Sequence, residues 1–172
     1  FMIINGKEIA ETLYAALLKE RAAFSGLTLG HLVTEMNPVT ASYARIKERG
    51  AERLGIKMIR TELPQDSDTD DAVTAVKHLA EICDGVIPQL PIVPGIDAVA
   101  VINAVPKEKD VDVLSEAAFS EFEKGSWPAI PPVSAALEYI LEHHQIPIQG
   151  ARVVVIGQGR LVGKPASILF SR

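Results

Sequence analysis

The chain has 172 residues and a formal net charge of −5, and 48% of its residues are hydrophobic but only 5% are aromatic. This length accommodates one ordinary domain, or one domain and part of a second, with a core packed mainly from aliphatic side chains. The acidic balance argues against a nucleic-acid partner, because phosphate binding needs a basic face. No apolar run reaches the roughly 20 residues of a membrane helix, so we expect no membrane association.

Helices and strands are expected to alternate along the chain. The expected strands are 27–34, 56–63, 85–87 and 152–156. The expected helices are 10–24, 38–54, 69–80, 96–104, 116–124, 134–144 and 164–172. Asn37 and Pro38 read as the N-cap and first residue of the second helix, and Gly55 as its end.

This alternation predicts an α/β fold built from parallel βαβ units with right-handed crossovers. We expect an N-terminal three-layer α/β/α domain with a mostly parallel sheet, followed by the start of a Rossmann-type dinucleotide-binding domain. The segment 125–132 is rich in Gly, Trp and Pro and reads as a crossing segment. It places the expected domains at 1–126 and 127–172.

The second helix carries a candidate site. Tyr43 and Lys47 are four residues apart and share one helix face. Lys47 falls within the expected apolar stripe, which comprises Tyr43, Ile46, Gly50 and Leu54. A lysine on a buried face is costly unless it is paired or functional, and burial favours proton exchange near neutrality. The alternative is a lysine that extends to solvent from the edge of the stripe.

Two loops carry further polar candidates. Gln89 follows the strand 85–87, and ligands of parallel α/β sheets bind beyond the carboxyl ends of the strands. Asp110 and Asp112 would share one side if their stretch is extended, and a carboxylate can accept two N–H bonds from a flat heterocycle. The alternatives are a loop amide with local hydrogen bonds and a solvated charged loop.

A glycine-rich turn, 157–165, lies between the expected strand 152–156 and the last helix. Its spacing is GxGxxxG, and glycines with a helix N-terminus favour phosphate binding. The candidate cofactor-binding residues are Gly157, Gln158, Gly159, Arg160, Leu161 and Val162. An ordinary strand-to-helix turn is the alternative. His31 is expected to be a core histidine, and no metal-ligand cluster is found.

Four motifs in this order resemble the bifunctional methylenetetrahydrofolate dehydrogenase/methenyltetrahydrofolate cyclohydrolase family. The family pattern Pro-x-Ser-x-x-Tyr-x-x-x-Lys is similar to residues 38–47, which end in Tyr-Ala-Arg-Ile-Lys. Gln-Leu-Pro-Leu resembles 89–92, Lys-Asp-Val-Asp-Gly resembles 109–113, and Val-Gly-x-x-x-x-Val-Gly-x-Pro resembles 156–165. The resemblance spans nearly the whole chain.

The resemblance implies residue roles. Lys47 would handle protons near the one-carbon bridge, and Tyr43 would stack on the folate. Gln89 would orient Lys47, and Asp112 would bind the pterin edge. The implied substrate-binding residues are Tyr43, Gln89, Leu90, Pro91 and Asp112. The implied chemistry is NAD(P)-dependent oxidation of 5,10-methylenetetrahydrofolate, followed by hydrolysis to 10-formyltetrahydrofolate.

The resemblance also implies NADP or NAD as cofactor, a tetrahydrofolate derivative as substrate, a homodimer and a link to purine biosynthesis. The single cysteine, Cys83, fits a reducing cytoplasm. The chain departs from the family pattern at Gln158 and Gly159, at Val113 in place of Gly, at Pro88 and at 131–136. We also expect the native protein to be longer, because the chain ends inside the first helix of the nucleotide-binding domain.

Two alternatives remain at this point. The chain could be another two-domain Rossmann dehydrogenase of the shikimate or amino-acid type, which also places a lysine near the cleft between domains. It could instead be a non-catalytic fragment that binds folate or dimerises.

Overall fold

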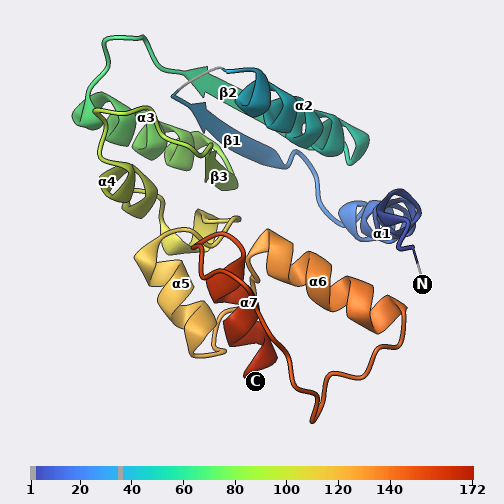
Figure 1. Ribbon diagram of the computed structural model, residues 1–172. Helices are drawn as coiled ribbons and strands as arrows, with labels where there is room; N and C mark the ends of the chain where they lie inside the picture. Colours follow the sequence, from blue (N-terminus) through green and yellow to red (C-terminus); the bar gives the residue numbers. More distant parts are fainter. Residues whose placement is uncertain (1–2, 35–36) are drawn as a thin grey trace. The chain divides into compact units, whose positions relative to one another are not determined.

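The computed structural model describes residues 3–34 and 37–172, which form two compact units, Phe1–Lys109 and Asp110–Arg172 (Figure 1). The first unit contains three strands, β1 (Thr28–Val33), β2 (Lys57–Glu62) and β3 (Gly85–Pro88). Its helices are α1 (Gly6–Arg21), α2 (Pro38–Arg53), α3 (Thr69–Ile82), α4 (Ala98–Asn103) and the 3₁₀ helix η1 (Lys107–Lys109). The second unit contains α5 (Glu116–Glu123), α6 (Pro132–His143) and α7 (Gly163–Phe170). The expected domain division at 126/127 stays a prediction.

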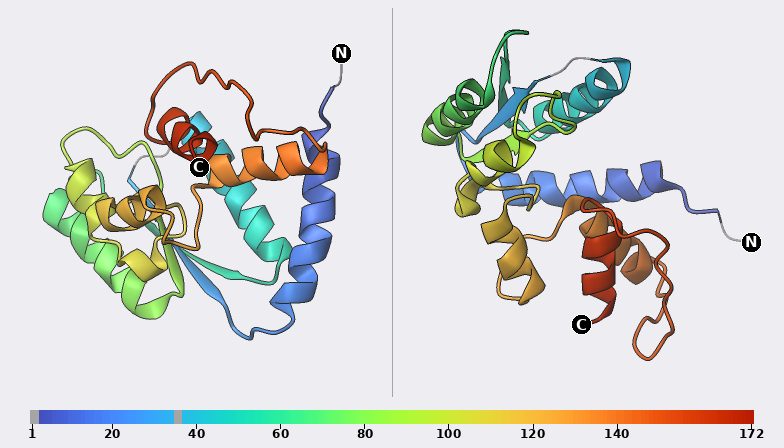
Figure 2. Two further views of the ribbon diagram at one scale, coloured as in Figure 1. Left: turned by 90° about the horizontal axis from the view of Figure 1, so that it is seen from below. Right: turned by 60° about the vertical axis from the view of Figure 1, so that its left-hand side comes forward.

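The strands of the first unit form a parallel sheet in the order β2-β1-β3. The chain therefore leaves β1 in one direction for β2 and returns across β1 to reach β3. Two right-handed crossovers in opposite directions place α2 and α3 on opposite faces of the sheet, as both views of Figure 2 show. This confirms the α/β fold with a parallel sheet between helices.

The start of α2 follows its expected cap. The side-chain oxygen of Asn37 accepts a hydrogen bond from the Thr40 backbone N–H at 2.9 Å, and Pro38 is the first helical residue. Gly55, with φ of +64°, follows the end of the helix in a conformation that favours glycine. By contrast, α1 begins at Gly6 rather than at residue 10, because the Asn5 side chain caps it at Glu8 N.

The main core of the first unit lies between the sheet and α3. Its buried members include Leu32 and Val86 from the strands and Val76 and Leu79 from α3. Gly30 lies directly beneath α3, because a Cβ placed on it would be 3.1 Å from the Leu79 Cβ. The close approach of α3 therefore requires a glycine at this point of β1.

Pro88 is accommodated in β3 without loss of a ladder hydrogen bond. β3 is an edge strand, and the Gln89 N–H donates to Leu32 O at 2.8 Å. Since alternate residues of a strand direct their N–H groups to the same neighbour, the Pro88 nitrogen faces away from β1. The missing donor thus falls on the unpaired edge, where proline is tolerated.

The second unit has its own small core and no strand anywhere in residues 110–172. Buried Val113, Ala118, Phe119 and Phe122 form this core, and Trp127, Ala129, Ile130 and Ile168 pack against it. The expected strand 152–156 is wrong: the segment is irregular, and Val154 and Ile156 are 83% and 96% exposed. A strand needs a neighbouring strand for its hydrogen bonds, and none of residues 110–172 provides one.

Candidate functional site

The two faces of the sheet differ in polarity. Side chains alternate along β1, so Leu32 points into the apolar core under α3 while His31 points to the opposite face. Register places Arg60 of β2 and Ile87 of β3 beside His31. Gln89 follows Ile87 by two residues, and it therefore lies on the same face. The face covered by α2 consequently gathers a histidine, an arginine and an amide.

His31 is the centre of this polar face. Its side chain is 0% exposed, and its Nε2 lies 3.2 Å from Oε1 of the buried Gln89. The Gln89 amide nitrogen donates to Leu90 O at 2.7 Å. Burial lowers the pKa of His31, and the nearby Lys47 cation lowers it further. Lys47 and Gln89 thus both lie close to one buried imidazole.

Lys47 comes from the face of α2 that packs toward the sheet. It is half-buried and shares this face with the buried Thr40, Ala44 and Ala51. The expected apolar stripe is therefore wrong in its members, since Tyr43 and Ile46 are both 58% exposed. Small residues on the packed face let α2 approach the sheet, and they leave the longer Lys47 side chain among them.

The aromatic and loop candidates lie at the rim. Tyr43 is one helical turn before Lys47, and most of its ring is exposed. Leu90 is half-buried and Pro91 is exposed, and the peptide bond between them is cis. An exposed phenol ring beside a half-buried amine can stack on a flat ligand that reaches the amine. The first unit therefore places Gln89 in contact with His31 and Lys47 near enough to His31 to lower its pKa, with Tyr43 one helical turn from Lys47 on α2.

The two aspartates of the second unit have different surroundings. The Asp110 carboxylate is buried and accepts the N–H groups of Leu114 at 3.1 Å and Ser115 at 2.6 Å. Asp112 is half-buried. The expectation that both lie on one side depended on an extended stretch, and the chain turns here instead, after η1. Asp110 is thus a structural cap, and Asp112 stays the predicted ligand residue.

Val113, which stands where the family pattern has glycine, has φ of +55° and is 1% exposed. A β-branched residue in the left-handed region is strained by about 1–3 kcal/mol. The side chain belongs to the small core of the second unit, so its burial offsets this strain. The turn that carries Asp112 is therefore kept in this chain without the usual glycine.

The glycine-rich turn precedes α7 as expected. Gly157 has φ of +95°, and a Cβ on Gly163 would lie 2.1 Å from Gly157 O. Only glycine fits this crossing of the backbone. Among the described residues, and apart from the chain neighbours, no atom lies within 4 Å of where a Cβ of Gly157 or Gly159 would stand. The turn is therefore tight, and it leaves space beside Gly157 and Gly159 where a phosphate could approach the backbone.

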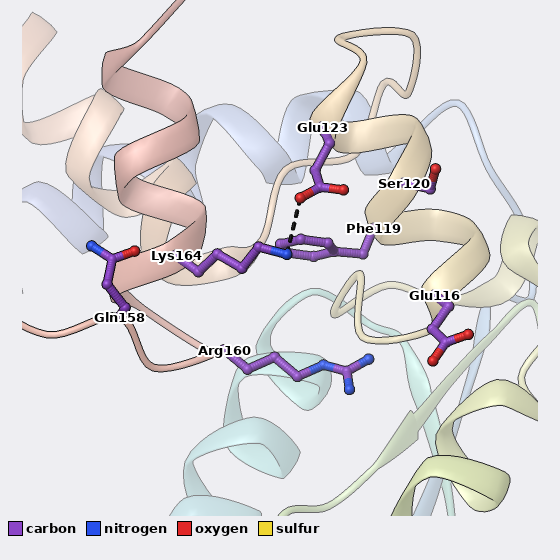
Figure 3. Close-up of a pocket in the computed structure, with 7 residues that line it drawn as sticks. All are labelled: Glu116, Phe119, Ser120, Glu123, Gln158, Arg160 and Lys164. Atoms are coloured by element: carbon purple, nitrogen blue, oxygen red, sulfur yellow. Dashed lines mark ion pairs between the residues drawn. The ribbon is translucent and has the colours of Figure 1, made fainter.

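The polar side chains of this turn have partners within the second unit. Arg160 donates to Leu114 O, and Gln158 donates to the Ser167 hydroxyl at 2.9 Å. Lys164 pairs with Glu123 at 3.0 Å and lies 4.6 Å above the Phe119 ring. Gln158, Arg160 and Lys164 line a pocket of about 490 Å³, and Figure 3 shows their side chains together with Glu123 and Phe119. The residues that line this pocket are Glu116, Phe119, Ser120, Glu123, Gln158, Arg160 and Lys164.

The sequence predicts that His31 lies in the core, but it does not predict the contact of His31 with Gln89. Its burial is confirmed, but Nδ1 has no hydrogen-bond partner in the part of the chain that is described. The signal was a histidine between the leucines at 29 and 32 of the strand. Among residues 3–34 and 37–172, no group of three or more His, Cys, Asp or Glu could hold a metal ion. No helix in these ranges is long and apolar enough to cross a bilayer.

Comparison with known proteins places this geometry in context. Residues 4–112 match the family model described as tetrahydrofolate dehydrogenase/cyclohydrolase, catalytic domain. The bifunctional protein FolD of Methanoculleus marisnigri is 37% identical over 173 residues, which cover 98% of this chain and 61% of that protein. FolD of Lactobacillus delbrueckii subsp. bulgaricus is 32% identical, with 98% and 62% covered. The chain thus spans about three fifths of the length of these relatives.

Solved structures of similar proteins have the same fold as this chain. The Trypanosoma brucei N5,N10-methylenetetrahydrofolate dehydrogenase-cyclohydrolase, complexed with NADP and an inhibitor, matches with a TM-score of 0.91 at 26% identity. That match covers 99% of this chain and 61% of the other. The Bombyx mori 5,10-methylenetetrahydrofolate dehydrogenase matches with a TM-score of 0.91 at 24% identity, over 98% of this chain and 60% of that one, and this likeness shows the fold alone.

Proposed function

Because the chain belongs to the tetrahydrofolate dehydrogenase/cyclohydrolase family, we propose that it acts in one-carbon folate metabolism. The proposed reactions are the NAD(P)-dependent oxidation of 5,10-methylenetetrahydrofolate to 5,10-methenyltetrahydrofolate and the hydrolysis of that product to 10-formyltetrahydrofolate. The family membership confirms the resemblance carried by the four motifs. It favours this function over the shikimate-type and amino-acid-type dehydrogenases.

The observation that carries the proposal is the meeting of Lys47 and Gln89 around buried His31 on one face of the sheet. Two residues far apart in sequence, each selected by a separate motif, converge at this point. The half-buried Lys47 is within reach of a ligand at the carboxyl end of β1 and β3, which is where parallel sheets bind ligands.

Hydrolysis needs one group that moves protons. Water adds to the methenyl carbon and must lose a proton, and the bond from this carbon to N5 of the pterin then breaks. As this bond breaks, N5 takes up one proton, and the hydroxyl of the adduct loses its remaining proton to solvent and becomes the formyl oxygen on N10. In the proposed mechanism, Lys47 takes the proton from water and passes a proton to N5. Gln89 holds the amine in place, and Tyr43 covers the pterin ring.

Asp112 is proposed to bind the pterin edge, where its two oxygens can accept N–H groups of the heterocycle. Leu90 and Pro91 would form the wall beside Gln89. The sequence motifs support these assignments, and Asp112 is half-buried.

NADP or NAD would be held at residues 157–162, where the tight turn and the start of α7 fit a pyrophosphate. The nicotinamide, when bound, supplies the acceptor for the hydride that leaves the one-carbon bridge. The remaining parts of the proposal are a homodimer, a cytoplasmic location and a supply of one-carbon units for purine biosynthesis. The single cysteine, which is buried, is consistent with a reducing compartment.

The test replaces Lys47 with Met, which keeps much of the side-chain length and removes the amine. Hydrolysis of 5,10-methenyltetrahydrofolate, followed by absorbance, is expected to slow by about 100-fold or more. Binding of tetrahydrofolate, measured by calorimetry, is expected to persist in this variant and to weaken in Asp112→Ala. Lys77→Met, at an exposed position of α3, is the matched control. Unchanged turnover in Lys47→Met, or a wild-type chain that neither binds nor hydrolyses folate, would refute the proposal.

A further inference from the structure

We propose that His31 is a positioning residue for the Lys47 chemistry, because its Nε2–H holds the Gln89 amide with its oxygen turned toward His31. The inference rests on the proposed function, in which Gln89 orients Lys47. An amide can turn over about its last bond, and the two orientations present an acceptor or a donor to a neighbouring ammonium. Only the acceptor orientation suits a lysine.

Two hydrogen bonds determine the orientation of the Gln89 amide. Its nitrogen lies 2.7 Å from Leu90 O, a position where an amide oxygen would face another oxygen. Its oxygen then lies 3.2 Å from the Nε2 of His31. Since that oxygen can only accept, Nε2 must carry a proton. A neutral imidazole has one N–H, so this assignment leaves Nδ1 as a bare acceptor.

The bare Nδ1 indicates that His31 is kept for a reason other than stability. The side chain is fully buried, and Nδ1 finds no hydrogen-bond partner among the described residues. A buried polar group without a partner destabilises the fold, a cost that an aliphatic side chain at this position would avoid. The polar contact that His31 does make is the one to Gln89, whose orientation the proposed reaction needs.

The charged groups around His31 favour its neutral form. Lys47 and Glu48 face it from α2 and Arg60 from β2, while Gln89 faces it from the end of β3. Burial is the largest cause of the lowered pKa of His31, and the two cations act in the same direction. The hydrogen bond with Gln89 and the Glu48 carboxylate oppose them. A buried imidazole that is held neutral orients its neighbour and does not exchange protons with the substrate.

Two substitutions separate the donor from the shape of the side chain. His31→Leu removes the donor at similar volume, while His31→Gln places an amide N–H near the position of Nε2. Loss of one such hydrogen bond is expected to lower kcat for methenyltetrahydrofolate hydrolysis by about tenfold. KM is expected to change by less than about threefold, because His31 does not touch the substrate. His31→Gln is expected to restore kcat to within about threefold of wild type.

The same chain gives a readout that does not depend on turnover. In ¹⁵N-labelled protein, NMR of the imidazole nitrogens should show His31 as the Nε2–H tautomer near neutral pH. Gln89→Leu should remove the oxygen that selects this tautomer and change the Nε2 resonance. A protonated Nδ1 in the wild type would overturn the inference whatever the kinetics show, and this readout survives if His31→Leu fails to fold.

The kinetic outcomes are equally decisive. If both His31 variants match the wild type, the residue only packs. If both are impaired alike, the imidazole shape matters and the donor does not, which also overturns the inference. A wild-type chain with the expected tautomer but no folate hydrolysis would instead remove the proposed function, and the positioning role with it.

Discussion

Replacing Asp110 with Ala is expected to destabilise the second unit strongly, although Asp110 itself has no proposed role in binding or catalysis. The carboxylate is 3% exposed and accepts two backbone N–H groups, those of Leu114 and Ser115, just before α5. Hydrogen bonds to a charged group contribute about 1.5–3 kcal/mol each, and the substitution leaves both donors buried. A loss of about 3 kcal/mol in the free energy of unfolding is a conservative sum. Asp110→Asn keeps one acceptor oxygen and is expected to lose about half as much.

The assay is urea denaturation followed by the fluorescence of Trp127, the single tryptophan, which packs against the core of the second unit. Glu142→Ala removes an exposed acid from α6 of the same unit and is the matched control, with an expected change within about 0.5 kcal/mol. A loss below about 1 kcal/mol in Asp110→Ala would refute the assignment of this carboxylate as a structural cap.

Three further predictions concern the first unit. Gly30→Ala should cost about 1–3 kcal/mol, since its Cβ would lie 3.1 Å from the Leu79 Cβ and 3.3 Å from the Cys83 Sγ; equal melting temperatures of variant and wild type would contradict this contact. Asn37→Ala should cost about 1 kcal/mol through loss of the α2 cap, whereas Asn37→Asp should cost little, as measured by urea denaturation. The pKa of His31 is lowered in the fold, so below its unfolded value of about 6.5 the unfolded chain binds a proton that the folded chain refuses. Stability should therefore fall as the pH decreases from about 7.5 to 5.5, and this part of the slope should be absent in His31→Gln.

Local sequence patterns predicted most of the first unit, because its strands and helices carry the residues that favour them. The strand at 28–33 is a run of mostly apolar residues, and α2 has both its cap and its terminating glycine. The start of α1 was missed because Asn5 caps a first turn that is polar and exposed, so hydrophobic periodicity does not mark it. Capping residues and the terminating glycine thus mark the ends of these helices better than hydrophobic periodicity does.

The wrong predictions share a physical cause. Whether a segment forms a strand, or which face of a helix is buried, depends on the elements that pack against it. The run of four aliphatic residues at 153–156 has the composition of a strand, but no other strand lies within residues 110–172 to pair with it. The face of α2 that packs on the sheet is set by small residues, and periodicity instead selected the larger Tyr43 and Ile46. The residue types and spacing selected Lys47 and Gln89, but their meeting at His31 depends on strand register, which no local pattern contains.

The unequal faces of the sheet separate what the fold depends on from what the chemistry depends on. Leu32 and Val86 stabilise the unit from beneath α3, whereas His31, Arg60 and Gln89 lie under α2 and add little apolar burial. Replacements on the α2 side are therefore expected to change the surroundings of the lysine more than the packing of the core beneath α3. The architecture and the site can in this way vary separately.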